Sequence, residues 1–171
     1  MMQRPSLGLA PTAVVFGYGG FGEAGLAAVA RAGFHVARVF THADAPGENC
    51  WWRSMAARAE ADGIPVVRDA DLRDAGVQAR VAADAPAFLF SFFYRHLIPN
   101  RVLGLATRGA YNFHSSLLPA FRGRAPLNWQ LVHGAEAAGL TLHRMAISAD
   151  AGGIVAQERV AIGPDDDARA L

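Results

Sequence analysis

The sequence predicts an α/β fold with an open, mostly parallel, twisted sheet and helices on both of its faces. Short apolar runs alternate with longer segments of helical pattern, as expected of repeated strand-helix-strand units. The run at 87–92 is apolar almost throughout, which is typical of a parallel strand with both faces buried. The 171 residues, 52% of them hydrophobic, are enough for one domain with its own core.

The elements are expected in a regular order. The first four strands are predicted at 12–16, 36–41, 65–67 and 87–92, and the helices between them at 22–32, 50–62 and 71–83. A strand at 109–114, a short helix at 126–133 and strands at 140–145 and 154–161 follow, with a turn at 148–153. Because no repeat, low-complexity tract or linker interrupts this order, we expect a single domain over residues 1–171.

Composition excludes several classes of partner and site. The net charge of +1 requires neither nucleic acid nor an anionic membrane. The single cysteine, Cys50, excludes an internal disulfide and is expected to be a free thiol in a helix. No apolar run approaches the roughly 18 residues of a membrane span, so we expect a cytoplasmic protein without membrane insertion. We predict no metal, because metal-ligand spacing is absent among the histidines His35, His42, His96, His133 and His143.

The last eight residues, 164–171, have the acid-rich opening of a helix, where carboxylates meet the positive end of the helix dipole. The chain stops within about two turns of that start. We therefore expect the domain to be truncated at its C-terminal end. A natural C-terminus that frays is compatible with the same residues.

A glycine-rich pattern, Gly17-Tyr-Gly-Gly-Phe-Gly22, follows the first predicted strand. It matches the G-x-G-x-x-G fingerprint of dinucleotide-binding proteins, which would make the chain an NAD(P)-binding oxidoreductase. The acidic residue that should end the second strand is missing there, since Asp44 lies further on in a loop. The alternative is a tight glycine turn that lets helix and strand pack closely.

Two polar side chains mark the end of the strand at 109–114. Side chains two apart on a strand point to the same face, so Asn112 and His114 project together. Burying both is costly unless they are hydrogen-bonded or face a cleft, and we favour a cleft over a structural histidine. The residues that end the strand at 87–92 should reach the same cleft, because open α/β sheets bind ligands at the carboxyl ends of their strands.

Asp150 precedes two glycines in the turn at 148–153. An aspartate in that position is usually a turn former. If the fold brought it close to His114, its carboxylate would hold the imidazole in one orientation and favour the protonated form.

Together these motifs resemble the folate-dependent formyltransferases, which include methionyl-tRNA formyltransferase and sugar-nucleotide N-formyltransferases. The resemblance is carried by Asn112-Phe-His114, Ser116-Leu-Leu-Pro119, Arg122-Gly123 and Asp150 with Gly152. The segments 40–48, 91–98, 122–129 and 141–145 are similar to the formyltransferase domains of the ArnA kind, which act on UDP-4-amino-4-deoxy-L-arabinose in lipid A modification and polymyxin resistance. The similarity runs from about Val14 to the end of the chain.

The resemblance implies a Rossmann-like domain that transfers a formyl group from 10-formyltetrahydrofolate to an amine without a metal. It implies that Asn112 stabilises the developing oxyanion, that His114 moves protons and that Asp150 orients His114. The folate would contact Ser91, Phe92, Phe93, Arg124, Ala146, Ile147, Ser148, Ala149 and Asp150. The small C-terminal β-barrel that the family usually carries is not in the sequence.

The acceptor is expected to be a nucleotide-linked amino sugar, and the assembly a homo-oligomer or a complex with a decarboxylase domain. Methionyl-tRNA is the alternative acceptor, although a near-neutral charge argues against tRNA. Ser115 stands where the family usually has glycine, and its side chain would crowd the cleft or force a different turn. A non-catalytic domain that binds folate or a nucleotide is therefore a further alternative.

Overall fold

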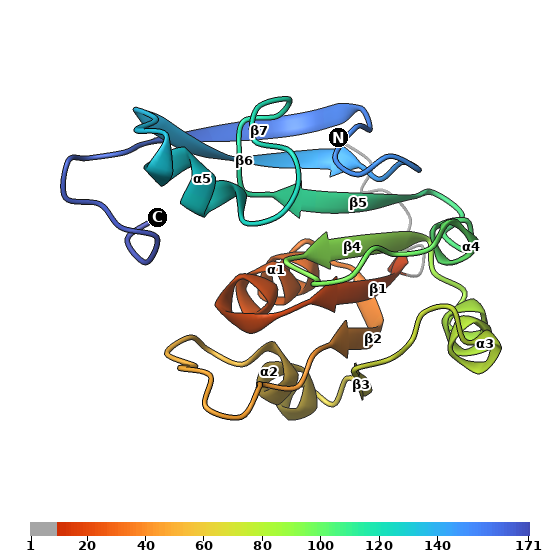
Figure 1. Ribbon diagram of the computed structural model, residues 1–171. Coiled ribbons are helices and arrows are strands. Elements are labelled where there is room, and N and C mark those ends of the chain that lie inside the picture. The colour runs from red at the N-terminus through yellow and green to blue at the C-terminus, as the bar shows by residue number, and fades with distance from the viewer. Residues whose placement is uncertain (1–9) are drawn as a thin grey trace, which may run out of the picture.

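The computed structural model describes residues 10–171, which contain one seven-stranded sheet (Figure 1). The strand order is β3-β2-β1-β4-β5-β6-β7. The first five strands in this order, β3, β2, β1, β4 and β5, run parallel to one another. Strand β6 pairs antiparallel with both β5 and β7. The strands are β1 (Thr12–Gly17), β2 (His35–Thr41), β3 (Val66–Arg68), β4 (Phe88–Phe92), β5 (Gly109–His114), β6 (Ala137–Arg144) and β7 (Ile154–Ala161). The predicted open, mostly parallel sheet is confirmed.

Helices cover both faces of the sheet, as predicted. One core cluster joins the strands to α1 (Gly19–Arg31) and α2 (Met55–Ala61). A second cluster joins them to α3 (Ala75–Ala83) and α4 (Asn100–Leu103), of which α4 was not predicted. The fifth helix, α5 (Pro126–Val132), contacts β6. Across residues 10–171, none of the helices combines the length and apolar character that crossing a membrane would require.

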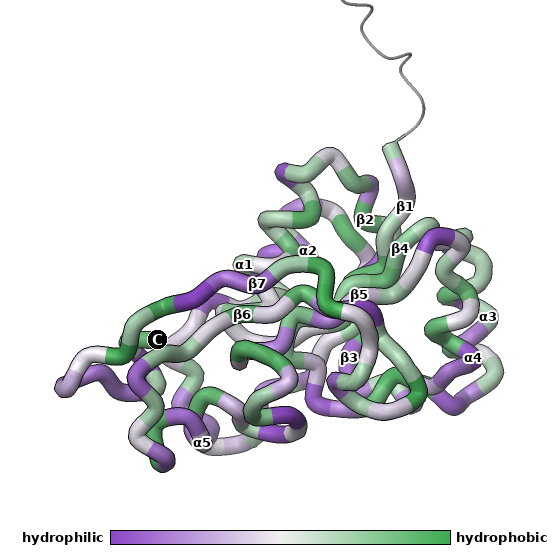
Figure 2. The backbone as a smooth tube through the Cα atoms, turned by 90° about the horizontal axis from the view of Figure 1, so that it is seen from above, coloured by the Kyte–Doolittle hydropathy of each residue, from purple (hydrophilic) through white to green (hydrophobic). Residues whose placement is uncertain are grey.

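The edge strand β7 differs from the strands in the centre of the sheet. All of its residues are exposed, whereas five of the six residues of β1 are buried. Figure 2 shows the same contrast in hydropathy, with a hydrophilic stretch in β7. The apolar core therefore lies around the parallel strands, and the antiparallel hairpin of β6 and β7 extends the sheet at one side.

Three predicted helical segments differ from the structure. Of the helix predicted at 71–83, only Ala75–Ala83 forms, because Asp74 is its N-cap and accepts a hydrogen bond from the Val77 N–H. Helix α2 begins only at Met55, because Ser54 is its N-cap and accepts a hydrogen bond from the Ala57 N–H at 3.3 Å. Cys50 consequently lies in an exposed loop and not in a helix. Residues 164–171 form turns instead of the predicted helix, and the Asp167 carboxylate accepts hydrogen bonds from the N–H groups of Arg169 and Ala170.

The glycine-rich turn after β1 brings this strand, α1 and α2 into close contact. A methyl group on Gly17 would lie 2.8 Å from the Met55 sulfur and 2.9 Å from the Phe92 carbonyl oxygen. One on Gly22 would lie 2.7 Å from the same sulfur. Neither position has room for a side chain, so close packing is sufficient to explain both glycines.

We expect Gly17→Ala to lower the free energy of unfolding by about 1–3 kcal/mol, because the added methyl group overpacks the core. The matched control is Gly153→Ala, since a methyl group there would have nothing within 4 Å. The control should change stability by less than about 0.5 kcal/mol. Urea denaturation measures both values, and equal effects would contradict the packing explanation.

Candidate active site

Polar side chains from β5 and β6 meet at the edge where the parallel strands end. Asn112 is directly opposite His143 in the β5–β6 pair, and residues opposite each other present their side chains on the same face. The Asn112 Nδ2 atom lies 3.2 Å from His143 Nε2. His114, the last residue of β5, places its ring centroid 6.4 Å from that of His143. The structure therefore brings both predicted β5 residues close to a second histidine.

Both ring nitrogens of His114 face oxygen atoms, and the residue is only 6% exposed. Nε2 lies 2.9 Å from the Phe121 carbonyl oxygen. Because a carbonyl can only accept, Nε2 carries a proton in this arrangement. Nδ1 lies 3.6 Å from Asp150 Oδ1. A substrate that exchanges a proton with Nε2 must therefore displace the Phe121 carbonyl.

The Asp150 carboxylate joins the two histidines to the loop after β5. Its Oδ1 atom lies 3.6 Å from His114 Nδ1 and 3.5 Å from His143 Nε2, and its Oδ2 atom accepts a hydrogen bond from the Gly123 N–H at 2.9 Å. Burial raises the pKa of Asp150, but its interaction with His143, the hydrogen bond from the Gly123 N–H and its interaction with His114 outweigh burial. The net effect lowers the pKa below its ordinary value, so Asp150 is ionised at neutral pH.

Sequence reasoning left His143 out of the site. Its side chain is 1% exposed, and Nδ1 lies 3.0 Å from the carbonyl oxygen of Arg144. The available signal was a histidine two residues after Thr141 in a predicted strand. That signal does not say which strand lies alongside, or in which register, and only the register places His143 opposite Asn112.

The loop after β5 is held by a buried hydroxyl of β6. Thr141 Oγ1 donates to the Ser116 carbonyl at 2.6 Å and accepts from the Leu118 N–H at 3.1 Å. Gln157 of β7 donates to the same hydroxyl at 2.9 Å. Ser115 is 7% exposed, and its hydroxyl has no hydrogen-bond partner within the described residues. Its side chain is therefore enclosed by protein instead of standing in an open cleft.

The residues expected to contact folate fall into two groups. Ser91 and Phe92 are 5% and 3% exposed, so their side chains face the interior. Phe93 is 43% exposed and stacks on Phe21 with ring centroids 4.2 Å apart. Exposed side chains also occur at Arg124, Ala146, Ile147, Ser148 and Ala149. An exposed aromatic face and a guanidinium suit a flat ligand with carboxylates.

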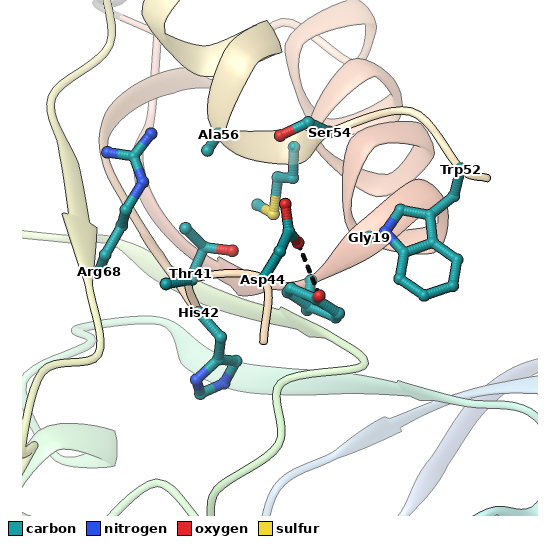
Figure 3. A pocket seen from close by; sticks show the side chains of 11 residues that line it. Gly19, Thr41, His42, Asp44, Trp52, Ser54, Ala56 and Arg68 are labelled. Atoms are coloured by element: carbon teal, nitrogen blue, oxygen red, sulfur yellow. Dashed lines mark hydrogen bonds between the residues drawn. The ribbon is translucent and has the colours of Figure 1, made fainter. Parts of the chain in front are cut away.

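A cavity of about 310 Å³ lies beside the glycine-rich turn, lined among others by Tyr18, Thr41, His42, Trp52 and Arg68 (Figure 3). The Tyr18 hydroxyl lies 2.7 Å from Asp44 and 2.9 Å from Glu48 and donates its one proton to either carboxylate. Arg95 pairs with Glu48 at 2.6 Å. Asp44, Glu48 and Cys50 bring possible metal-ligand atoms within 4.8 Å of one another, but both carboxylates are already engaged by this chain.

Comparison with known proteins finds a family model, described as formyl transferase, that matches residues 13–171. The phosphoribosylglycinamide formyltransferase of Bacillus halodurans has a TM-score of 0.75 and 25% identity, over 92% of this chain and 84% of that chain. A formyltetrahydrofolate deformylase of Pseudomonas syringae pv. tomato has a TM-score of 0.76 and 20% sequence identity, and the match covers 96% of this chain and 55% of that chain. WlaRD, a sugar 3N-formyl transferase solved with dTDP and 5-N-formyl-THF, has a TM-score of 0.71 and 20% sequence identity, and the match covers 95% of this chain and 56% of that chain. The last two likenesses show a shared fold.

The lowered pKa of Asp150 predicts how its replacement affects stability. Ionisation of Asp150 stabilises the folded protein above its ordinary pKa of 3.8, and this contribution is lost as the pH falls through the lowered value. Asp150→Asn should therefore reduce the free energy of unfolding at neutral pH, and the difference from wild type should shrink below pH 3.8. Urea denaturation of both proteins at the two pH values tests this, and a constant difference would contradict it.

Proposed function

Because this chain belongs to the formyl transferase family, we propose that it transfers a formyl group from 10-formyltetrahydrofolate to the amine of a nucleotide-linked amino sugar. The acceptor we favour is UDP-4-amino-4-deoxy-L-arabinose. The observation that carries the proposal is the cluster of Asn112, His114 and Asp150, in which Asp150 lies 3.6 Å from His114. Membership of this family favours formyl transfer over NAD(P)-dependent oxidation.

Asn112 supplies a hydrogen-bond donor for the formyl oxygen. When an amine attacks the formyl carbon, negative charge develops on that oxygen, and a positioned amide N–H stabilises it. Nδ2 carries two hydrogens, and one of them faces His143 at 3.2 Å. The second hydrogen remains for the substrate. One such donor contributes about 2.7–4 kcal/mol in acyl transfer.

His114 moves the proton. The attacking amine must lose a proton and the departing nitrogen must gain one, and a histidine that changes protonation state serves both steps. Asp150 is ionised and close to Nδ1, so it holds the ring in place while the ring is charged. Proton exchange at Nε2 requires that the substrate replace the Phe121 carbonyl, which now accepts from this atom.

The formyl donor, when bound, supplies an activated formyl group on a folate nitrogen. Phe93 offers an exposed ring for stacking against the flat part of the folate, and Arg124 offers a guanidinium for its carboxylates. Residues 146–149 are exposed and lead directly into Asp150. For the buried Ser91 and Phe92, we propose contact through the backbone at the end of β4.

The choice of an amino-sugar acceptor rests on two supports. The segment 122–129 resembles the enzymes that formylate UDP-4-amino-4-deoxy-L-arabinose, and one structural neighbour is a sugar 3N-formyl transferase. A net charge of +1 is unfavourable for tRNA, which usually requires a basic surface. The Bacillus halodurans neighbour is a phosphoribosylglycinamide formyltransferase, so the corresponding glycinamide ribonucleotide is the main competing acceptor.

The direct test incubates the purified chain with 10-formyltetrahydrofolate and each of three amines: the UDP-sugar, glycinamide ribonucleotide and methionyl-tRNA. Mass spectrometry detects the formylated product, with an Asn112/His114 double variant as control. We expect formylated UDP-sugar with the wild-type protein and none with the double variant. Formylation of another amine would overturn the acceptor, and folate binding without any product would favour a non-catalytic folate-binding domain.

Single replacements in the cluster should abolish most turnover and leave the fold intact. Asn112→Ala should lower kcat by about 10²- to 10³-fold, because it removes an oxyanion donor. His114→Ala should lower kcat by about 10²- to 10⁴-fold, because it removes the acid–base group. The control is His35→Ala, at an exposed position on β2, which should keep wild-type kcat. Full activity of His114→Ala would contradict the mechanism.

A further inference from the structure

His143 makes three contacts to which the proposed mechanism assigns no role. Its Nδ1 atom lies 3.0 Å from the Arg144 carbonyl oxygen. Its Nε2 atom lies 3.2 Å from Asn112 Nδ2 and 3.5 Å from Asp150 Oδ1. With a side chain that is 1% exposed, both ring nitrogens must find their partners inside the protein. The pairing of each nitrogen therefore determines where the ring carries its proton.

The Arg144 carbonyl fixes the tautomer of the neutral ring. A carbonyl oxygen can only accept, so Nδ1 must be the nitrogen that carries hydrogen. Nε2 then presents a lone pair, and the group that faces it at 3.2 Å must donate. In Asn112 only the amide nitrogen can donate, so its NH₂ group, and not its oxygen, is held next to His143.

Protonation of His143 would reverse this arrangement. Two titratable side chains face the ring, namely Asp150 and His114. A proton on Nε2 would turn this atom into a donor toward Asp150, and the Asn112 amide would have to rotate to present its oxygen. His114 Nδ1 faces the same Asp150 oxygen at 3.6 Å. Unlike His143 Nε2, this nitrogen is not faced by the amide of Asn112. Because the Asn112 amide nitrogen lies closer to His143 Nε2 than the Asp150 oxygen does, at 3.2 Å against 3.5 Å, the geometry points to the neutral ring, in which Nε2 accepts from Asn112.

We infer that His143 is a positioning residue that holds the Asn112 amide with its nitrogen available to the formyl oxygen. With one Nδ2 hydrogen bound to Nε2 of His143, the amide plane is fixed and the second hydrogen has a set direction. Without this acceptor the amide is free to rotate and to present its oxygen to the developing negative charge, which repels it. The catalytic consequence rests on the proposed function, whereas the hydrogen bond itself does not.

The hydrogen bond is tested first, without any substrate. Nitrogen-15 NMR of the imidazole rings in the full chain distinguishes the two neutral tautomers and the charged form. We expect His143 to be neutral with hydrogen on Nδ1 at neutral pH. Hydrogen on Nε2, or a charged ring, would overturn the inference whether or not the chain formylates the UDP-sugar.

The catalytic consequence is tested by a pair of variants with 10-formyltetrahydrofolate and UDP-4-amino-4-deoxy-L-arabinose. His143→Asn keeps a donor near the Arg144 carbonyl but removes the acceptor at the Nε2 position. We expect kcat to fall by at least about 10-fold. This loss should be smaller than the loss of about 10²- to 10³-fold that follows when an oxyanion donor is removed altogether. KM for the folate should stay unchanged. His143→Gln can place an amide oxygen where Nε2 was and should restore most of kcat.

Combination with Asn112→Ala separates positioning from a structural role. If His143 acts through Asn112, then His143→Asn should cost no more than about 2-fold in the Asn112→Ala background, because the interaction is already lost. An equal loss in both backgrounds would overturn the inference, as would wild-type kcat in a folded His143→Asn protein. If wild type does not formylate this sugar, the proposed acceptor fails while the NMR result still decides the hydrogen bond.

Discussion

The ionised carboxylate of Asp150 is the constraint on which the arrangement of the site depends. A charge that is largely removed from water is tolerated only where several groups compensate it. The groups closest to it come from three segments: the Gly123 N–H, in the loop between β5 and α5, donates to it, and His114 of β5 and His143 of β6 lie within 3.6 Å of it. Satisfying this one group therefore ties two strands and a loop together, and the loop in turn places the Phe121 carbonyl against His114.

Most of the buried polar side chains of the described residues lie near the end of β5, and a smaller group, Thr41, His42 and Ser91, lies at the ends of β2 and β4. The clusters around β1, β2 and β4 are built from apolar residues, whereas His114, Gln130, Thr141 and His143 are buried polar groups near the end of β5. The antiparallel β6 supplies Thr141 as a partner for the Ser116 carbonyl and His143 as a partner for Asn112, whereas the loop after β5 supplies the partners of His114 and Gln130. The strand that breaks the parallel pattern is thus the one that completes the site.

Much of the fold could be predicted from the sequence, because continuous apolar runs such as 87–92 leave few alternatives to a buried parallel strand. The pairing of Asn112 with His114 on one face followed from strand alternation alone. His143 could not be found in this way, since its role depends on the register of β6 against β5. The helical pattern at 50–54 failed because Ser54 caps α2 at a later position, and the glycine pattern at 17–22 is explained by packing against Met55.

The separation of the paired residues along the chain bears on the order in which the structure assembles. Contacts that are close in sequence form faster than distant ones, because a shorter loop loses less entropy on closure. The β6–β7 hairpin and its pairing with β5 lie within residues 109–161, whereas β1 pairs with β4 across three intervening helices and two strands. Asn112, His114, His143 and Asp150 all belong to that contiguous stretch. The strand β3 lies at the far edge of the sheet from this stretch. Local opening of β3 would accordingly leave the contacts among these four side chains in place.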